Sequence, residues 1–219
     1  MCLIVLAWKT VADHPLVVAA NRDEFHGRPA APAAFWRDKP AILAGRDLEA
    51  KGTWMGVTCG GRFAAVTNFR GATEPRAAES RGALVTRFLE NSVSSGDFLE
   101  ALTRNTALYS GFNLLVCDGE ELWSMSNRDG PPRELEPGVY GLGNTLLDAP
   151  EVDEPKRRLQ ALEVPAVEPL FGVLAPSKIV NERYGTRCST VLIQGKTTRY
   201  AERSFSPAGD DQETVHYQF

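Results

Sequence analysis

The residue that could do chemistry most directly is the cysteine at position 2. If Met1 is removed, one residue carries both a thiol and a free α-amine. An α-amine titrates near ~8, so at neutral pH a fraction can take the thiol proton while the thiolate attacks a carbonyl carbon. With Met1 attached, the nitrogen of Cys2 is an amide without basicity. Since a small cysteine also suits a buried strand, position alone leaves a structural role open.

Several short motifs follow Cys2 in a fixed order along the chain. They include N-R-D-E (residues 21–24), A-G-R-D-L-E-A-K-G-T-W-M-G-V (44–57), T-N-F-R (67–70), S-R-G (80–82), G-L-G-N (141–144) and Y-G-T-R-C-S-T-V-L (184–192). Together they resemble the NRDE family, also called the transport and Golgi organization protein 2 family. The resemblance extends over the whole chain.

The resemblance implies an α+β fold, a four-layer αββα sandwich of two antiparallel sheets similar to the N-terminal-nucleophile hydrolases. Among these, it points to the cysteine-headed acylases of penicillin V and conjugated bile salts. Catalytic candidates at matching places in the chain are Cys2, Asp23, Asn144 and Arg187. Asp23 would hold the α-ammonium, Asn144 would donate to a developing oxyanion, and Arg187 would lower the thiol pKa.

Further residues of the motifs are candidates for binding a substrate or ligand. Arg22 and Asp23 are adjacent, and adjacent strand residues point to opposite faces, so a salt bridge that ties down a loop is an equal alternative for Arg22. Asn68 is a second oxyanion candidate or a strand-end turn residue, and Arg46 either rims a pocket or braces a loop. The full set of binding candidates is Asn21, Arg22, Arg46, Trp54, Asn68 and Cys188.

Two functions follow from the resemblance. The family is linked to haem trafficking, which implies a haem-handling protein that binds haem non-covalently, with its pocket centred on Cys2. Cys2, Cys188 and the histidines are possible axial ligands. The alternative is a cysteine amidohydrolase that cleaves a linear amide after Met1 removal and needs no cofactor. Either way we expect a small amphipathic partner, haem or an acyl amide, while the oligomeric state stays open.

Composition excludes other classes. The formal charge is −4, from 24 Lys+Arg against 28 Asp+Glu, and no basic stripe exists that could bind nucleic acid. The four cysteines show no C-x-x-C spacing, so we expect no metal site and free thiols in a reducing, cytoplasmic compartment. The apolar residues 2–8 are too few for a membrane span or signal peptide.

The elements that must position these residues alternate between strands and helices, and we expect one domain over residues 1–219. Apolar runs predict strands at 2–8 and 16–20, a proline-rich loop at 27–40, and hairpins around Gly60-Gly61 and Asp118-Gly119. Ser80 predicts a helix start, and Asp97 with Glu100 resembles a capping box. Further helices are predicted from Pro155 and over 169–174, and strands at 187–194, 197–205 and 215–219.

Overall fold

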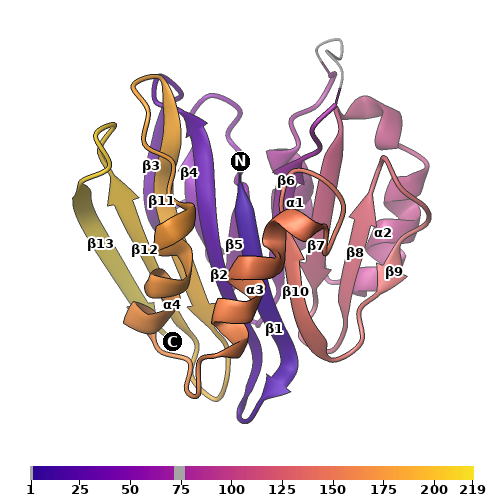
Figure 1. The fold of residues 1–219 in the computed structure, drawn as a ribbon. Coiled ribbons are helices and arrows are strands. Elements are labelled where there is room, and N and C mark those ends of the chain that lie inside the picture. Colours follow the sequence, from indigo (N-terminus) through magenta and orange to yellow (C-terminus); the bar gives the residue numbers. More distant parts are fainter. Residues whose placement is uncertain (1, 72–76) are drawn as a thin grey trace. The chain divides into compact units, whose positions relative to one another are not determined.

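The computed structural model describes residues 2–71 and 77–219, which form two compact units (Figure 1). Unit 1 contains the chain up to Arg28, Pro137–Gly143 and Leu147–Phe219. Unit 2 contains Pro29–Glu136 and Asn144–Leu146. Each unit has one antiparallel sheet with helices, which gives the two sheets of the α+β class expected from the sequence.

Unit 1 is a six-stranded sheet in the order β10-β1-β2-β11-β12-β13. The helices α3 and α4 lie over one face of it, as Figure 1 shows. Its elements are β1 (Leu3–Val11), β2 (His14–Phe25), β10 (Gly138–Leu142), α3 (Asp153–Gln160), α4 (Val167–Leu174), β11 (Tyr184–Ile193), β12 (Arg199–Phe205) and β13 (Asp211–Gln218), with short 3-10 turns at Pro150–Val152 and Ala175–Ser177.

The continuous apolar character of β1 follows from burial on both of its faces. Leu3 and Val5 belong to the apolar cluster that packs against α3 and α4. The alternate residues Ile4 and Leu6 point to the opposite face and are also buried. The centre of this sheet is therefore closed to water on either side, which a continuous apolar run requires.

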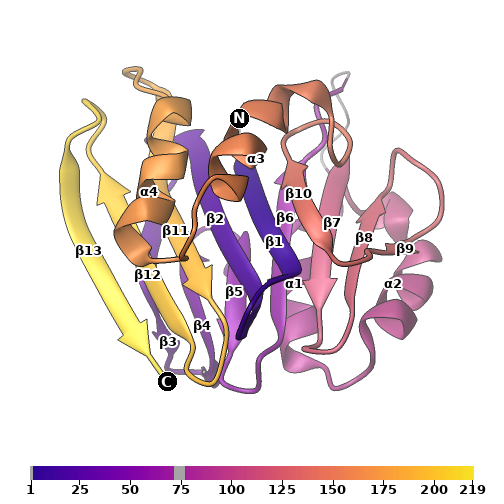
Figure 2. The ribbon, with the colours of Figure 1, turned by 60° about the horizontal axis from the view of Figure 1, so that its bottom comes forward.

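Unit 2 is a seven-stranded sheet in the order β3-β4-β5-β6-β7-β8-β9. The helices α1 and α2 pack on one of its faces through a cluster that includes Phe88, Leu99 and Phe112 (Figure 2). Its elements are β3 (Ala30–Trp36), β4 (Lys39–Asp47), β5 (Met55–Thr58), β6 (Phe63–Asn68), α1 (Gly82–Glu90), α2 (Ser95–Thr103), β7 (Phe112–Cys117), β8 (Leu122–Ser126) and β9 (Arg133–Glu134), with a 3-10 turn at Thr106–Leu108.

Two motif glycines are explained by the packing of α1. A Cβ on Gly52 would lie 2.7 Å from the backbone of Gly82, and a Cβ on Gly82 would lie 3.0 Å from the carbonyl oxygen of Thr53. A side chain cannot be accommodated at 2.7 Å from backbone and is crowded at 3.0 Å, so the close approach of α1 to the segment before β5 requires glycine at position 52 and favours it at position 82. The helix start predicted at Ser80 was wrong by one residue, because Arg81 is the N-cap of α1 and makes no side-chain cap hydrogen bond, although Oγ of Ser80 accepts the N–H of Gly82 at 3.3 Å.

Two further sequence predictions were wrong in detail. Residues 27–40 are not a loop, because they contain β3 and the start of β4. Pro32 is tolerated since β3 is an edge strand, where a missing N–H leaves no ladder bond unmade. The helix start predicted from a capping box at Asp97 and Glu100 was also wrong. Helix α2 begins earlier, at Ser95, because the side chain of Ser94 caps it by accepting the N–H of Asp97 at 3.1 Å.

Both predicted hairpins of unit 2 are confirmed. Strands β5 and β6 flank a turn in which Gly61 has φ +84°, and β7 and β8 flank a turn in which Gly119 has φ +106°. Among the described residues, none of the helices combines the length and the apolar character needed to cross a membrane.

Candidate functional site

Cys2 directly precedes β1 and is partly buried. Leu3 pairs with Asn21, and the same antiparallel register continued by one residue sets Cys2 opposite Arg22. The thiol donates to the carbonyl oxygen of Asp23 at 3.5 Å. Burial, followed by the negative charge of Asp23, raises the pKa of the Cys2 thiol to about 11, and the charge of Arg22 acts in the opposite direction. With Met1 attached, the thiol is therefore protonated at neutral pH.

Arg22 is a buried cation between two thiols. Its register partner on β11 is Cys188, and its charge lowers the pKa of both Cys2 and Cys188. The residue is 9% exposed, and Oε2 of Glu24 lies 3.7 Å from its Nη2. Within the described part of the chain, its buried Nη1 has no hydrogen-bond partner. Such a nitrogen is costly to bury and suited to a ligand that carries a negative charge.

Asp23 is held by β11 and also lies next to the thiol. Thr186 donates its hydroxyl hydrogen to Oδ1 of Asp23 at 2.6 Å and accepts the N–H of Ile179 at 2.8 Å. The register of β11 against β2 shifts between Thr186 and Cys188, so Arg187 is the extra residue of a β-bulge. This shift lets β11 pair with both Asp23 and Arg22.

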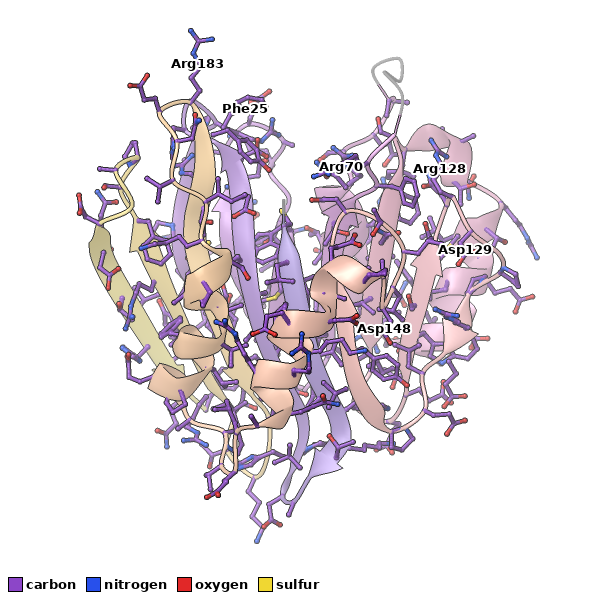
Figure 3. The ribbon with its side chains drawn as sticks, in the orientation of Figure 1. Phe25, Arg70, Arg128, Asp129, Asp148 and Arg183 are labelled. Carbon is purple, nitrogen blue, oxygen red and sulfur yellow. The ribbon has the colours of Figure 1, made fainter. Side chains whose placement is uncertain are left out.

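Arg187 braces the turn after β2. Its Nη1 donates to the carbonyl oxygens of Phe25 at 3.0 Å, His26 at 3.2 Å and Arg28 at 3.1 Å. Phe25 lies at the end of β2, and Arg183 projects outward from the segment before β11 (Figure 3). Arg22 is an arginine whose charge lowers the pKa of the Cys2 thiol. A role for Arg187 in the chemistry stays a prediction.

The sequence analysis missed a buried group in unit 1 formed by Thr190, Tyr200 and Glu202. Thr190 donates to Oε2 of Glu202 at 3.2 Å, and Glu202 is a register partner of Thr190 on β12. Burial and then the charge of Glu202 raise the pKa values of Cys188 and Tyr200 far above their usual range. The available signal was the polar pair Ser189 and Thr190 directly before the apolar Val191 and Leu192 in the last motif.

Asn21 is a structural tie. It is fully buried, its Nδ2 donates to the carbonyl oxygen of Leu174 at 3.3 Å, and its Oδ1 accepts the Ser189 hydroxyl at 2.6 Å. These bonds fasten β2 to the end of α4 and to β11. Because Asn21 and Arg22 are neighbours on a strand, the asparagine points away from the face that carries Arg22 and Cys188.

In unit 2, the structure brings the two oxyanion candidates together. Nδ2 of Asn144 donates to the main-chain oxygen of Asn68 at 2.7 Å, and the Asn144 carbonyl accepts the N–H of Arg70 at 2.6 Å. The bond to Asn68 uses one of the two donor hydrogens of the Asn144 side-chain amide. That either asparagine donates to an oxyanion stays a prediction. Trp54 is half-buried, and its carbonyl accepts the N–H of Val66 at 2.8 Å.

Arg46 acts as a brace in unit 2. It makes two hydrogen bonds with the Asp38 carboxylate, at 2.5 and 2.7 Å, and stacks 4.2 Å from the centre of the Trp36 ring. The hydrogen bonds lower the pKa of Asp38 to about 2. Asp47 accepts two backbone N–H groups of its own turn. Of the alternatives for Arg46, the loop brace is the one that these contacts favour.

The second N-R-D string, residues 127–129, forms a surface turn as predicted. Oδ1 of Asn127 accepts the N–H of Phe112 at 2.8 Å, and Figure 3 shows Arg128 and Asp129 at the surface of unit 2. Two histidines interact with carbonyl oxygens, His14 with Gln194 and His26 with Asn181. In the described ranges, no three His, Cys, Asp or Glu side chains gather as a metal site would require.

The fold is that of the N-terminal-nucleophile hydrolases. A variant of the conjugated bile acid hydrolase from Clostridium perfringens aligns with a TM-score of 0.58 and 11% identity over 99% of this chain and 97% of its own. The N-acylethanolamine-hydrolyzing acid amidase ortholog of Caenorhabditis elegans aligns with a TM-score of 0.57 and 13% identity, over 88% and 92% of the two chains. At this identity the likeness shows the fold alone.

Sequence relatives give the family. The human Transport and Golgi organization protein 2 homolog is 42% identical over 144 residues, which are 62% of this chain and 52% of the human protein. The mouse homolog is 40% identical over the same length. The chain thus spans about half the length of these relatives. Residues 1–168 match the Transport and Golgi organisation 2 family, and the chain therefore belongs to this family.

Proposed function

We propose that the chain is a cysteine amidohydrolase whose nucleophile is Cys2 once Met1 has been removed. The observation that carries the proposal is the setting of Cys2, a partly exposed thiol at the head of β1 that bonds to the backbone of Asp23 and is influenced by the charges of Asp23 and Arg22. The fold neighbours named as an acid amidase and a bile acid hydrolase add support.

Removal of Met1 is essential to this proposal. At a pKa of about 11, only about one thiol in ten thousand is ionised at neutral pH. A free α-amine on Cys2 would provide a base for the thiol proton, and the nearby Asp23 carboxylate would stabilise the resulting α-ammonium. The positive charge of the Arg22 guanidinium would stabilise the Cys2 thiolate.

The proposed reaction has two halves. The α-amine takes the thiol proton, the thiolate forms a C–S bond to the amide carbon, and the tetrahedral intermediate collapses with cleavage of the C–N bond. The leaving amine takes the proton from the α-ammonium, and a thioester remains on Cys2. Water then attacks the thioester with the α-amine as base, which releases the carboxylic acid and restores the thiol.

Intact mass and acyl trapping test the proposal. Protein produced in cells with a normal methionine aminopeptidase is expected to lack Met1 and to gain one acyl group from a p-nitroanilide of a fatty acid. Cys2→Ser should lose the thioester, whereas Cys59→Ser, which removes an exposed thiol of unit 2, should keep it. Full retention of Met1, or equal acylation of the wild type and Cys2→Ser, would contradict the proposal.

Haem handling in the cytoplasm is a second candidate, favoured by the buried Nη1 of Arg22. A haem propionate could pair with this guanidinium, as could the carboxylate of another amphipathic ligand. Thiolate ligation is disfavoured, because the pKa values of both Cys2 and Cys188 are raised. Haem titration is expected to give a weak spectral change that Arg22→Met reduces and Arg62→Met does not. An unchanged spectrum in both redox states would remove this candidate.

A further inference from the structure

One carbonyl group of β2 receives two side chains. The main-chain oxygen of Asp23 accepts the Cys2 thiol at 3.5 Å and the phenol of Tyr184 at 3.2 Å. A carbonyl oxygen has two lone pairs, so both donors can bind at once. The sulfur and the phenol oxygen are therefore neighbours around a single acceptor, although they belong to strands that lie on opposite sides of β2.

Tyr184 is held firmly enough for its hydroxyl to have a defined place. It is the register partner of Phe25 on β2, and the two rings meet edge to face with their centres 5.3 Å apart and an interplanar angle of 74°. Edge-to-face contact is a favoured geometry for aromatic pairs. Tyr184 also begins the motif that contains Thr186 and Arg187. Thr186 bonds to the Asp23 carboxylate and Arg187 to the Phe25 carbonyl, so this part of β11 fixes the end of β2.

We propose that Tyr184 is a positioning residue that weakens the hydrogen bond from the Cys2 thiol to the Asp23 carbonyl. Two donors that share one acceptor compete for its electron density, so each bond is weaker than it would be alone. Without the phenol, the carbonyl would accept the S–H more strongly and keep the proton on sulfur. The nearby charges of Asp23 and Arg22 are the same with and without the phenol.

This inference refines the proposed function, on which it rests for its chemical consequence only. As the thiol proton leaves Cys2, the Asp23 carbonyl loses one donor and would be left partly unsatisfied. The Tyr184 hydroxyl keeps that carbonyl bonded, so the loss of the S–H bond costs less free energy. Tyr184 would thus act on the nucleophile through the backbone of Asp23, without touching the substrate.

Site-resolved alkylation tests the inference without any turnover. The protein is treated with iodoacetamide at mildly alkaline pH, and mass spectrometry follows Cys2 relative to the exposed Cys59, which serves as an internal reference. Tyr184→Phe is expected to lower the Cys2/Cys59 rate ratio roughly three-fold, the effect of a modest change in one hydrogen bond. A purely structural role for Tyr184 predicts the opposite, because loosened packing would expose the thiol and raise the ratio.

Matched variants separate the phenol from its ring. Tyr217→Phe makes the same chemical change on β13 and should leave the ratio unchanged, and Phe25→Leu removes the ring contact but keeps the phenol, so it should not lower the ratio. Fluorotyrosine incorporation makes the phenol a stronger donor, which should raise the ratio in the wild type but not in Tyr184→Phe.

The two proposals fail in different ways. An unchanged or increased ratio in Tyr184→Phe overturns the role of Tyr184, whatever acyl trapping shows. A wild type that forms no acyl-enzyme overturns the amidohydrolase while a three-fold lower ratio in Tyr184→Phe would still support the control of the thiol by Tyr184.

Discussion

The two units differ in what their sheets bury. Among the residues that the structure describes, the buried charged side chains are Arg22, Asp23 and Glu202, and all three belong to the sheet of unit 1. The buried polar side chains of unit 2, such as Thr67 and Asn113, are neutral. Burying a charge costs free energy that a neutral group does not cost. The sheet of unit 1 therefore gives up stability at the place where the thiol lies.

The same residue types have different consequences in the two units. In unit 2, the Arg46 guanidinium pairs with Asp38 at the surface. In unit 1, Arg22 and Asp23 are buried, and their charges act on the pKa of Cys2. An Arg next to an Asp is thus a brace where water solvates it and an electrostatic device where water is excluded.

The largest effect on stability is expected from the apolar core of unit 2. Phe88 is fully buried on α1, and its ring lies 5.1 Å from that of Phe98. Phe88→Ala should lower the free energy of unfolding by about 3–5 kcal/mol, because a cavity adds to the lost transfer free energy. Urea unfolding followed by tryptophan fluorescence measures it. Leu108→Ala, at a half-exposed position, should change it by less than about 0.5 kcal/mol. A loss below about 2 kcal/mol for Phe88→Ala would contradict a rigid apolar scaffold in unit 2.

A smaller effect is expected from unit 1 at alkaline pH. The pKa of the Cys2 thiol rises from 9.0 to about 11 in the folded chain that keeps Met1. A raised pKa stabilises the fold below the unfolded value, and this contribution disappears as pH rises through the folded value. Between pH 9 and 11, the wild type should lose about 1–2 kcal/mol more than Cys2→Ser, a range reduced because the thiol is partly exposed.

Cys59→Ser provides the control for this experiment, since it removes an exposed thiol of unit 2 and should keep the alkaline loss of the wild type. The measurement is urea unfolding at a series of pH values on protein whose intact mass includes Met1. Parallel curves for the wild type and Cys2→Ser would show that the environment of the thiol is the same in the folded and unfolded chains.

Local signals predicted the strands well where the pairing is local. β7 and β8 have the predicted limits, because each is a short apolar run and an Asp-Gly turn joins them. β3 was missed because a proline-rich string indicates a loop unless the strand lies at a sheet edge, and edge position is a property of the assembled sheet.

The order of the motifs along the chain predicted only part of the site. Cys2 and Asp23 do lie together, and the charge of Arg22 also acts on the thiol, while a role for Arg187 in the chemistry stays a prediction. The place of Arg22 opposite Cys188 depends on the β-bulge at Arg187, which arises from the register of β11 against β2, two strands that are far apart in sequence. Tyr184 was missed for the same reason, since its bond to Asp23 crosses 161 residues of chain.

The smallest expected change in the free energy of unfolding comes from an arginine of unit 1, and an arginine of unit 2 provides the comparison. Arg62 in unit 2 donates to the carbonyl oxygens of Phe88 at 3.3 Å and Val93 at 2.9 Å, and stacks 4.0 Å from the centre of the Phe88 ring. Arg62→Met should therefore cost about 1–3 kcal/mol. Arg22→Met should change the free energy of unfolding by less than about 1 kcal/mol, since methionine keeps the apolar stem and removes a buried nitrogen that lacks a partner.

The two arginine variants are compared by urea unfolding at neutral pH. The Arg22→Met variant leaves Glu24 without its distant ion pair, but the Glu24 side chain is 25% exposed and water can solvate it. A loss of 2 kcal/mol or more in Arg22→Met would mean that Arg22 stabilises the fold of unit 1, as Arg62 does in unit 2. A change of less than about 1 kcal/mol together with slower alkylation of Cys2 would mean that the buried charge of Arg22 serves the reactivity of the thiol rather than the stability of the fold.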